Sequence, residues 1–143
     1  MFNNVMMVCI GNICRSPMAE AILQHNRPEL KVYSSGLGAL SGKPADPSTM
    51  KILSEINIDF DHVAQQINSV LVKNADIILT MEDKHVQSII SQFPESRGKV
   101  HLIGKWQNNE QIPDPYKKDF EAFQESYHLI NKGLEAWQEK LWN

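Results

Sequence analysis

The sequence predicts an α/β fold in which helices cover both faces of a small parallel sheet. Short apolar runs, typical of buried strands, alternate along the chain with segments of helical periodicity. Hydrophobic residues make up 42% of the 143 residues, enough to bury a substantial core, and no shift in composition or long linker divides the chain. We therefore expect one three-layer domain that spans residues 1–143.

The first expected unit is a strand, a loop and a helix. Val5–Val8 is a continuous apolar run, as in a short buried strand. Ser16 and Pro17 then give the start signal of a helix, with serine as N-cap and proline at the first helical position. This helix is expected to extend to about His25. The loop between the two elements therefore joins the carboxyl end of a strand to a helix N-terminus, which is where parallel sheets bind ligands.

The remaining segments repeat this alternation of strand and helix. The further expected elements are, in chain order, a strand at Lys31–Ser34, a helix at about Pro47–Ile56, a short helix near Ser69–Lys73, a strand at Asp76–Thr80, a helix from about Glu82 to Gln92, a strand at Val100–Ile103 and a last helix from about Lys118 to Leu141.

The last helix carries one continuous apolar face. We expect this face to pack onto the sheet, because its residues give only about three heptads, which is short for a coiled coil with a partner. The residues of this face recur at alternating steps of three and four: Phe120, Phe123, Tyr127, Ile130, Leu134, Trp137 and Leu141.

The loop after the first strand is the strongest functional signal in the chain. It reads Cys-Ile-Gly-Asn-Ile-Cys-Arg-Ser, with five residues between Cys9 and Arg15. Backbone N–H groups in such a loop converge on an anion, and the dipole of the following helix adds positive charge at the same place. The segment therefore predicts a site for a tetrahedral dianion.

The side chains of this loop suit covalent chemistry on that anion. A helix N-terminus and a nearby arginine favour the thiolate form of a cysteine, so Cys9 is the expected nucleophile. The fork of Arg15 matches two phosphoryl oxygens, and Ser16 can donate its hydroxyl to the sulfur. Gly11 permits close backbone approach, and Asn12 tolerates a left-handed conformation. The competing interpretation, an inert cysteine that ends a buried strand, leaves the following arginine and serine unexplained.

A second loop, Ile112–Tyr116, supplies a candidate general acid. Asp114 lies between two prolines, which restrict its backbone and can aim its carboxyl group at a leaving oxygen. Tyr116 can form an apolar wall for an aromatic substrate ring. Taken alone, this segment equally suits a turn that begins the last helix, so the acid role depends on the first loop.

Charge and composition argue against several other classes of protein. The net charge of −3 disfavours general binding of nucleic acids or anionic membranes. Attraction of phosphate must then be local, with Lys43, Lys105, Lys117 and Lys118 as candidate contacts beside Arg15. No segment has the pattern of a signal peptide or a membrane span, and no Walker-type nucleotide loop is present, so we expect a cytoplasmic protein.

The cysteines and histidines give no metal-binding pattern, and we expect neither a metal nor a cofactor. Both cysteines, Cys9 and Cys14, lie in one loop, which suits neither a secreted disulfide scaffold nor a zinc site. The histidines are scattered without the spacing of metal ligands, and we expect them to be structural or exposed: His25, His62, His85, His101 and His128.

Together, the two loops resemble those of the low molecular weight protein tyrosine phosphatase family. The resemblance covers nearly the whole chain and includes Tyr33–Pro47, His62–Ile67 and Asp76–Met81. It implies a four-stranded sheet in the order 2-1-3-4. A leucine-type residue near Leu40, where animal members have a larger aromatic, makes the chain similar to bacterial members that act on tyrosine autokinases of capsule or exopolysaccharide export. A phosphotyrosine protein of that kind is the implied partner.

The resemblance also implies roles for individual residues. Cys9 would form a phosphocysteine intermediate, Arg15 would clamp the phosphoryl group, and Asp114 would act first as acid and then as base. Cys14 would form a reversible disulfide with Cys9 under oxidation. Residues expected to contact substrate are Ile10, Gly11, Asn12, Ile13, Cys14, Arg15, Ser16, Leu40 and Tyr116, and those expected to support the loop are Asn12, Ser16, Ser34 and His62.

Two departures from the family pattern concern substrate preference and regulation. Gln65 stands where the family often has arginine, and Lys117 stands where animal members place a second tyrosine. Two other functions stay open from the sequence: arsenate reduction, and non-catalytic phosphotyrosine binding or redox sensing. Thioredoxin-coupled arsenate reduction uses additional cysteines, and none follows Cys14. Every catalytic residue type is present, so the sequence does not support a loss of activity.

Overall fold

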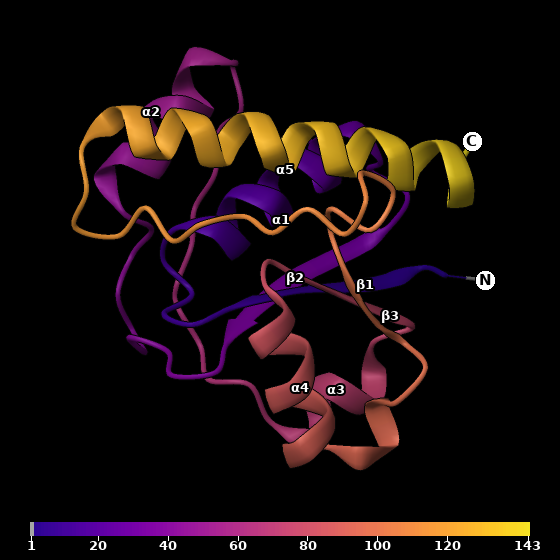
Figure 1. Cartoon of the computed structure of the whole chain (residues 1–143). Coiled ribbons are helices and arrows are strands. Elements are labelled where there is room, and N and C mark those ends of the chain that lie inside the picture. Colours follow the sequence, from indigo (N-terminus) through magenta and orange to yellow (C-terminus); the bar gives the residue numbers. More distant parts are fainter. Residues whose placement is uncertain (1) are drawn as a thin grey trace.

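A four-stranded parallel sheet forms the middle layer of the computed structural model, which describes residues 2–143 (Figure 1). The strand order is β2-β1-β3-β4, as the family resemblance implied, so the first strand lies inside the sheet. All three strand pairings are parallel. The strands are β1 (Asn4–Cys9), β2 (Lys31–Gly36), β3 (Ile77–Thr80) and β4 (Val100–Leu102).

Helices cover both faces of this sheet, which confirms the predicted fold class (Figure 1). On one face lie α1 (Arg15–Asn26), α2 (Pro47–Glu55) and the long α5 (Phe120–Leu141), whereas α3 (Ser69–Asn74) and α4 (Asp83–Gln92) lie on the other. A single 3₁₀ turn at 94–96, which the sequence did not predict, follows α4.

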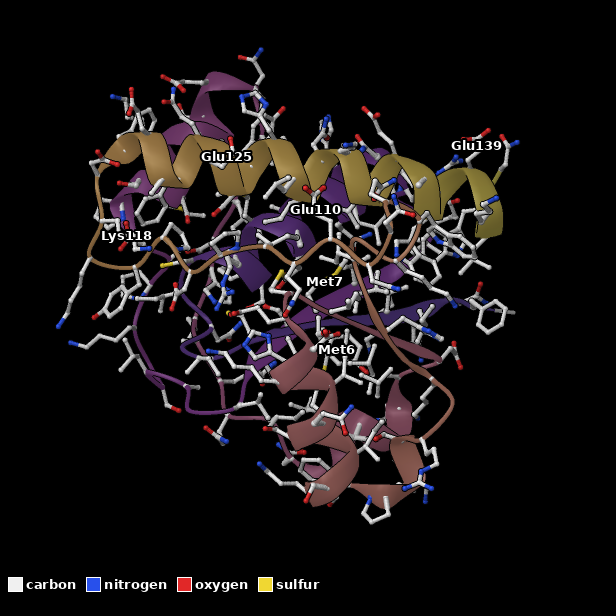
Figure 2. All side chains as sticks on the ribbon, in the orientation of Figure 1. Met6, Met7, Glu110, Lys118, Glu125 and Glu139 are labelled. Carbon is white, nitrogen blue, oxygen red and sulfur yellow. The ribbon has the colours of Figure 1, made fainter. Side chains whose placement is uncertain are left out.

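The central strand β1 divides its side chains between two hydrophobic cores. Val5, Met7 and Cys9 face the core under α1, α2 and α5, while Met6 and Val8 face the core under α3 and α4. This follows from the period of two along a strand. Both methionines lie in the interior between the layers, whereas charged side chains on α5 and in the loops point outward (Figure 2).

The start of α1 differs from the prediction in a way that matters for function. The helix begins at Arg15 with Cys14 as its N-cap residue, which makes no side-chain capping bond, so the prediction of Ser16 as N-cap was wrong. Ser16 lies inside the first turn, and its hydroxyl contacts the sulfur of Cys9 instead. The serine predicted to cap the helix therefore bonds the Cys9 sulfur instead of the first backbone N–H groups of α1.

The end of β2 passes close to the loop that follows β1. The strand extends to Gly36, beyond the predicted end at Ser34, and pairs Gly36 with Cys9. A methyl group on Gly36 would overlap the carbonyl oxygen of Ile10, so only glycine fits there. The loop after β1 is thus packed directly against β2.

The apolar face of α5 packs mainly on α1 and α2 and meets the sheet at the end of β4, so the prediction that it packs onto the sheet is only partly confirmed. Gly133 lies so close to Ile103 that a side chain would overlap it. Trp137 donates its indole N–H to the carbonyls of Leu102 and Ile103 at 3.1 Å each. The helix begins at Phe120, two residues later than predicted. No helix within residues 2–143 is long and apolar enough to cross a membrane.

Candidate active site

The loop from Cys9 to Ser16 is held from outside through its carbonyl groups. From Cys9 to Cys14, every carbonyl oxygen accepts a hydrogen bond from a neighbouring segment, at donor–acceptor distances between 2.7 and 3.1 Å. The donors are, in order along the loop, the backbone N–H groups of Leu37, Gly38 and Leu40, the ring of His62, the backbone N–H of Asp46 and the hydroxyl of Thr49.

This outward arrangement of carbonyls determines where the amides point. No cis peptide bond occurs in the described chain, and in a trans peptide the C=O and the next N–H point in opposite directions. Carbonyls that bind the surroundings therefore turn the following N–H groups toward the inside of the loop. Within residues 2–143, the N–H groups of residues 10–14 donate to no protein acceptor. They form a cradle of free donors for an oxyanion.

Asn12 connects the loop to its supports and fixes its shape. Its backbone is left-handed, with φ of 58°, as the sequence predicted for a tight ring of amides. Its side-chain Nδ2 donates to the hydroxyls of Ser16 at 2.8 Å and Ser34 at 2.9 Å, and its Oδ1 accepts the N–H of Gln65 at 2.9 Å.

These bonds determine the direction of the hydroxyl protons. Because Asn12 donates to the oxygen of Ser16, the Ser16 proton is free to be donated to Cys9 Sγ, which lies 2.9 Å away. In the same way, Ser34 donates to Glu20 Oε1 at 2.6 Å. A chain of polar groups thus leads from the half-buried Glu20 to the sulfur of Cys9, with the Ser16 hydroxyl as its last donor.

Two titratable groups border this network. Burial raises the pKa of Glu20 to about 7, although the hydrogen bond from Ser34 opposes the shift. Burial lowers the pKa of His62, against the effect of its hydrogen bond to Asn12. His62 Nε2 lies 2.7 Å from the Asn12 carbonyl oxygen, which can only accept, so that nitrogen carries a proton.

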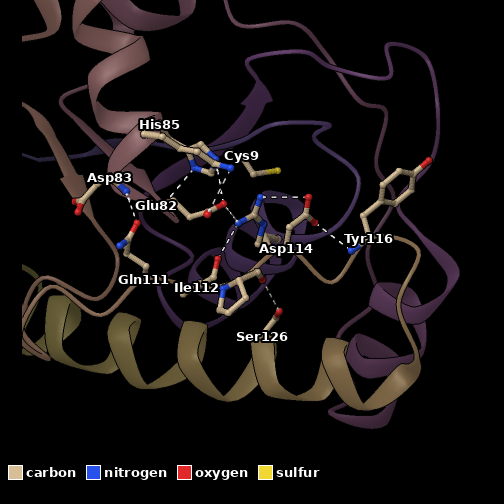
Figure 3. Close-up of polar contacts among 12 residues, drawn as sticks. Cys9, Glu82, Asp83, His85, Gln111, Ile112, Asp114, Tyr116 and Ser126 are labelled. Carbon is tan, nitrogen blue, oxygen red and sulfur yellow. Dashed lines mark hydrogen bonds and ion pairs between the residues drawn. The ribbon is translucent and has the colours of Figure 1, made fainter.

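Arg15 is buried and held from two sides, with 1% of its surface exposed. Its Nη1 donates to Glu82 Oε2 at 2.6 Å and to the carbonyl of Ile112 at 2.8 Å (Figure 3). Its Nη2 lies 3.7 Å from Asp114 Oδ2. Its Nε is buried without a hydrogen-bond partner in the described chain, which is the state expected of a donor that serves a bound anion.

Glu82 is the ion-pair partner of Arg15 and was not predicted as a site residue. Burial acts to raise the pKa of Glu82, but the hydrogen bond and the positive charge of Arg15 outweigh it, and the pKa is lowered overall. Glu82 therefore remains ionised and fixes the guanidinium. Its position directly after β3, at the carboxyl end of the neighbouring strand, is the signal by which the sequence could have revealed it.

Asp114 approaches Arg15 from the loop before α5, on the opposite side from Glu82 (Figure 3). Its Oδ1 accepts the N–H of Tyr116 at 3.1 Å, and 48% of its side chain is exposed. The two loops enclose a narrow cavity of about 60 Å³. Its lining residues are Cys9, Ile10, Gly11, Cys14, Arg15, Asp114 and Tyr116.

The other residues that were expected to contact substrate do not line this cavity. Asn12, Ile13 and Ser16 have buried side chains outside its lining. Leu40 is 40% exposed and lies beside Gly11. These residues can act through their backbone or at the rim, but none lines the floor of the cavity.

Two of the candidate lysines, Lys117 and Lys105, lie in different surroundings. Lys117 stays near the cavity, with its Nζ 5.5 Å from the ring centre of Tyr116. Lys105 lies instead over the rings of Trp106 and Trp137, beside the end of β4, so the suggestion that it contacts substrate was wrong. Cation–π contact with these indoles accounts for its place.

Both cysteines are free thiols. Burial, followed by the negative charges of Asp46, Cys9 and Asp114, raises the pKa of Cys14, so its thiol stays protonated while Cys9 is the candidate thiolate. Within residues 2–143, no group of three or more histidine, cysteine or acidic side chains is arranged to hold a metal ion.

Comparison with known proteins gives the same assignment along the whole chain. Residues 4–143 match the family model described as low molecular weight phosphotyrosine protein phosphatase. The low molecular weight protein-tyrosine-phosphatase Wzb of Escherichia coli (strain K12) is 49% identical over 142 residues, covering 99% of this chain and 97% of that protein. The probable low molecular weight protein-tyrosine-phosphatase EpsP of Ralstonia nicotianae is 44% identical, covering 96% and 94%.

A solved structure agrees in detail with the fold described above. Wzb of Vibrio vulnificus in complex with benzylphosphonate superimposes with a TM-score of 0.95 at 41% identity, and the match covers 99% of this chain and all of that one. This protein therefore belongs to the low molecular weight phosphotyrosine protein phosphatase family and is a protein-tyrosine-phosphatase.

Proposed function

We propose that this enzyme hydrolyses phosphotyrosine through a phosphocysteine intermediate, with Cys9 as nucleophile, Arg15 as phosphoryl clamp and Asp114 as general acid and base. One observation carries the proposal: the cradle of free amides surrounds a sulfur that accepts a hydrogen bond from Ser16 and lies beside a buried guanidinium. This arrangement stabilises a thiolate together with the dianion that it attacks.

In the first half-reaction, the thiolate of Cys9 attacks phosphorus in line with the phenolic oxygen. The S–P bond forms as the P–O bond to tyrosine breaks, and the proton of Asp114 goes to the departing oxygen. The loop amides and Arg15 bind the equatorial oxygens during transfer. Asp114 must be protonated at this stage, because it supplies the proton that goes to the leaving oxygen.

In the second half-reaction, Asp114 takes a proton from a water molecule while the water oxygen attacks phosphorus. The S–P bond breaks, the electron pair returns to sulfur, and inorganic phosphate leaves. Ser16 donates its proton toward the thiolate as it departs, at the 2.9 Å separation seen here. The same hydroxyl therefore serves both half-reactions.

The shape of the cavity supports an aromatic phosphate ester as substrate. The cradle lies at the end of a narrow cavity whose walls include Ile10 and Tyr116, each about two-fifths exposed at the rim. A long, flat phosphotyrosine side chain reaches the sulfur through such an opening, while the shorter phosphoserine does not. The Vibrio vulnificus relative binds benzylphosphonate, which joins an aromatic ring to a tetrahedral anion.

We further propose a phosphorylated tyrosine autokinase of capsule or exopolysaccharide export as the partner, and the cytoplasm as the place of action. The bacterial relatives named Wzb and EpsP support this partner through the family resemblance. A reducing compartment supports the active state, because Cys9 must be a free thiol to react. One domain at residues 1–143 would carry all of this chemistry.

Two substitutions test the assigned roles. Cys9→Ser should remove turnover, and rapid quenching of the unmodified enzyme with labelled substrate should trap phosphate on Cys9. Asp114→Asn should lower kcat by roughly 10²- to 10³-fold on a phosphotyrosine peptide, but much less on para-nitrophenyl phosphate, whose leaving group needs no proton.

Glu139→Gln, an exposed carboxylate on α5, is the matched control and should change neither rate. Equal losses on both substrates would refute the acid role of Asp114. Phosphate trapped on any residue other than Cys9 would refute the nucleophile. Loss of turnover on metal chelation would refute a mechanism based on Arg15 and the loop amides alone.

A further inference from the structure

His85 lies in the first turn of α4 and is fully buried, with no exposed surface. From the sequence it was one of several scattered histidines without an assigned role. A buried imidazole requires partners for both ring nitrogens. Its surroundings show which groups lie next to each nitrogen (Figure 3).

The hydrogen bonds of His85 fix its tautomer. Its Nδ1 accepts the backbone N–H of Glu82 at 3.3 Å, so that nitrogen carries no proton. The proton of the neutral ring therefore lies on Nε2. Burial, followed by the positive charge of Arg15, lowers the pKa of His85 to about 4, so the ring stays neutral in the physiological range.

The protonated nitrogen faces the acidic partner of Arg15. His85 Nε2 lies 3.4 Å from Glu82 Oε2, and this same oxygen accepts Arg15 Nη1 at 2.6 Å. Nε2 has no hydrogen-bond partner at ideal geometry in the described chain. The other charged groups that act on the ring are Lys84 and Asp114. Nε2–H is thus a buried donor without a hydrogen-bond partner in the described chain, 3.4 Å from a carboxylate oxygen of Glu82.

We infer that His85 is a positioning residue, which holds the Glu82 carboxylate through Nε2–H and thereby holds Arg15 in the orientation that binds the phosphoryl group. The inference rests on the proposed role of Arg15. Nothing in it requires His85 to touch the substrate.

The physical reason lies in the competition for Arg15 during binding. A dianionic substrate competes with Glu82 for the positive charge of Arg15, which weakens the interaction that stabilises the partly buried Glu82 carboxylate. A neutral N–H at 3.4 Å can close to hydrogen-bond distance and stabilise that carboxylate. A protonated histidine would instead compete with Arg15 for Glu82 and repel the guanidinium, which is why a neutral ring suits this position.

Two substitutions separate the roles of the ring nitrogens. His85→Asn keeps an acceptor at the δ position for the Glu82 N–H but removes the ε donor. His85→Gln keeps a donor at the ε position. We expect His85→Asn to raise the inhibition constant of inorganic phosphate and the KM for a phosphotyrosine peptide by roughly three- to tenfold, with a smaller change in kcat. His85→Gln should restore both constants to within about twofold.

The route through Glu82 is tested by combining His85→Asn with Glu82→Gln. If His85 acts through that carboxylate, its substitution adds little once the carboxylate is gone, and the two effects are strongly non-additive. Additive effects would overturn the inference. So would a His85→Asn variant that loses thermal stability while its phosphate affinity is unchanged.

Arg15→Lys separates failure of this inference from failure of the proposed function. If Arg15→Lys leaves phosphate inhibition unchanged, the clamp itself is wrong. If Arg15→Lys weakens inhibition and His85→Asn does not, only the inference about His85 fails.

The control for the substitution type is His128→Asn, which changes an exposed histidine on α5 and should alter neither constant. Imidazole ¹⁵N spectra should show His85 as the Nε2–H tautomer from pH 5 to pH 9, and a ring that titrates in that range would contradict the mechanism.

Discussion

The two loops that meet at the cavity are held in different ways. In the Cys9–Ser16 loop the carbonyls from Cys9 to Cys14 are all bonded from outside, and Arg15 is almost completely buried. In the Ile112–Tyr116 loop, nearly half of the Asp114 side chain is exposed. In the proposed mechanism, the first loop presents many donors to a dianion at fixed positions, whereas the second only delivers and collects one proton. The loop that binds the dianion is therefore more firmly held than the loop that carries Asp114.

The Asp114 loop is nevertheless tied to its surroundings at a few points. The N–H of Ile112 donates to the carbonyl of Met81 at 2.9 Å, and Arg15 Nη1 donates to the Ile112 carbonyl. Ser126 on α5 donates to the carbonyl of Pro113 at 3.2 Å. Prolines on both sides of Asp114 replace the remaining hydrogen bonds as a source of stiffness. Few links of this kind leave Asp114 within reach of both substrate and water.

Among the changes that compare the two loops, the largest effect is expected at Asn12, whose side chain bonds both within the rigid loop and to its neighbours. Asn12→Ala removes the donors to Ser16 and Ser34 and the acceptor for Gln65, and it places alanine at a left-handed φ. We expect kcat/KM to fall by roughly 10²- to 10³-fold on any phosphate ester, because the amide cradle loses its shape. Steady-state kinetics and phosphate inhibition would measure the loss.

Asn57→Ala is the matched control for backbone strain. Asn57 also has a left-handed backbone, with φ of 61°, but it is exposed and lies outside the cavity lining. This substitution should cost about 1 kcal/mol of stability and leave the kinetics unchanged. If both variants lost activity equally, the special role of the Asn12 side chain would be disproved.

The sequence predicted those features of the two loops that depend on local sequence pattern. Strand β1, the loop after it and the residue types Cys9, Arg15 and Asp114 follow from apolar runs, spacing and proline positions. The supports of the loop could not be predicted in this way. Glu82 lies 67 positions from Arg15, and a glutamate after a strand has many other uses. Contacts of that kind depend on how the strands pair, which hydrophobic periodicity does not specify.

The use of Ser16 shows a second limit of local pattern. Serine before proline is a good helix start by propensity, and the sequence alone predicted that use. In the structure a hydrogen bond to the Cys9 sulfur takes its hydroxyl, and α1 begins at Arg15 without a side-chain cap. The contact with Cys9 therefore replaces the helix cap that local propensity favours, as is expected at functional sites.

The next effect concerns the pH dependence of stability beneath the rigid loop. The pKa of Glu20 is about 7 in the folded protein, against an ordinary value of 4.5. Between these values the folded protein holds a proton that the unfolded chain has lost. This contribution therefore falls as pH rises from about 4.5 to about 7, and it is constant above that range.

Glu20→Gln should remove this contribution. We expect the difference in unfolding free energy between the two proteins to change by on the order of 2 kcal/mol between pH 4.5 and pH 8. Urea unfolding of both proteins across this range measures it, and the subtraction cancels the histidines, whose lowered pKa values act in the opposite direction. A difference that does not vary with pH would show that folding does not raise the pKa of Glu20.

The smallest effect compares one equivalent bond in each loop. Ser126→Ala removes the hydroxyl that donates to the Pro113 carbonyl, and Thr49→Val removes the hydroxyl that donates to the Cys14 carbonyl at 3.1 Å. The Cys14 carbonyl keeps the N–H of Met18 as a second donor, and its neighbours in the loop keep theirs. Within residues 2–143, the Pro113 carbonyl in the Asp114 loop has no second donor.

Ser126→Ala should therefore lower kcat on a phosphotyrosine peptide by roughly three- to fivefold and leave phosphate inhibition unchanged. Thr49→Val should change either constant by less than about twofold, because a bond that is one of many restraints contributes little to the position of the loop. Full kinetics of both variants on one peptide make the comparison direct. Equal effects would mean that the two loops are equally restrained, and the division between a fixed anion cradle and a less restrained proton donor would be wrong.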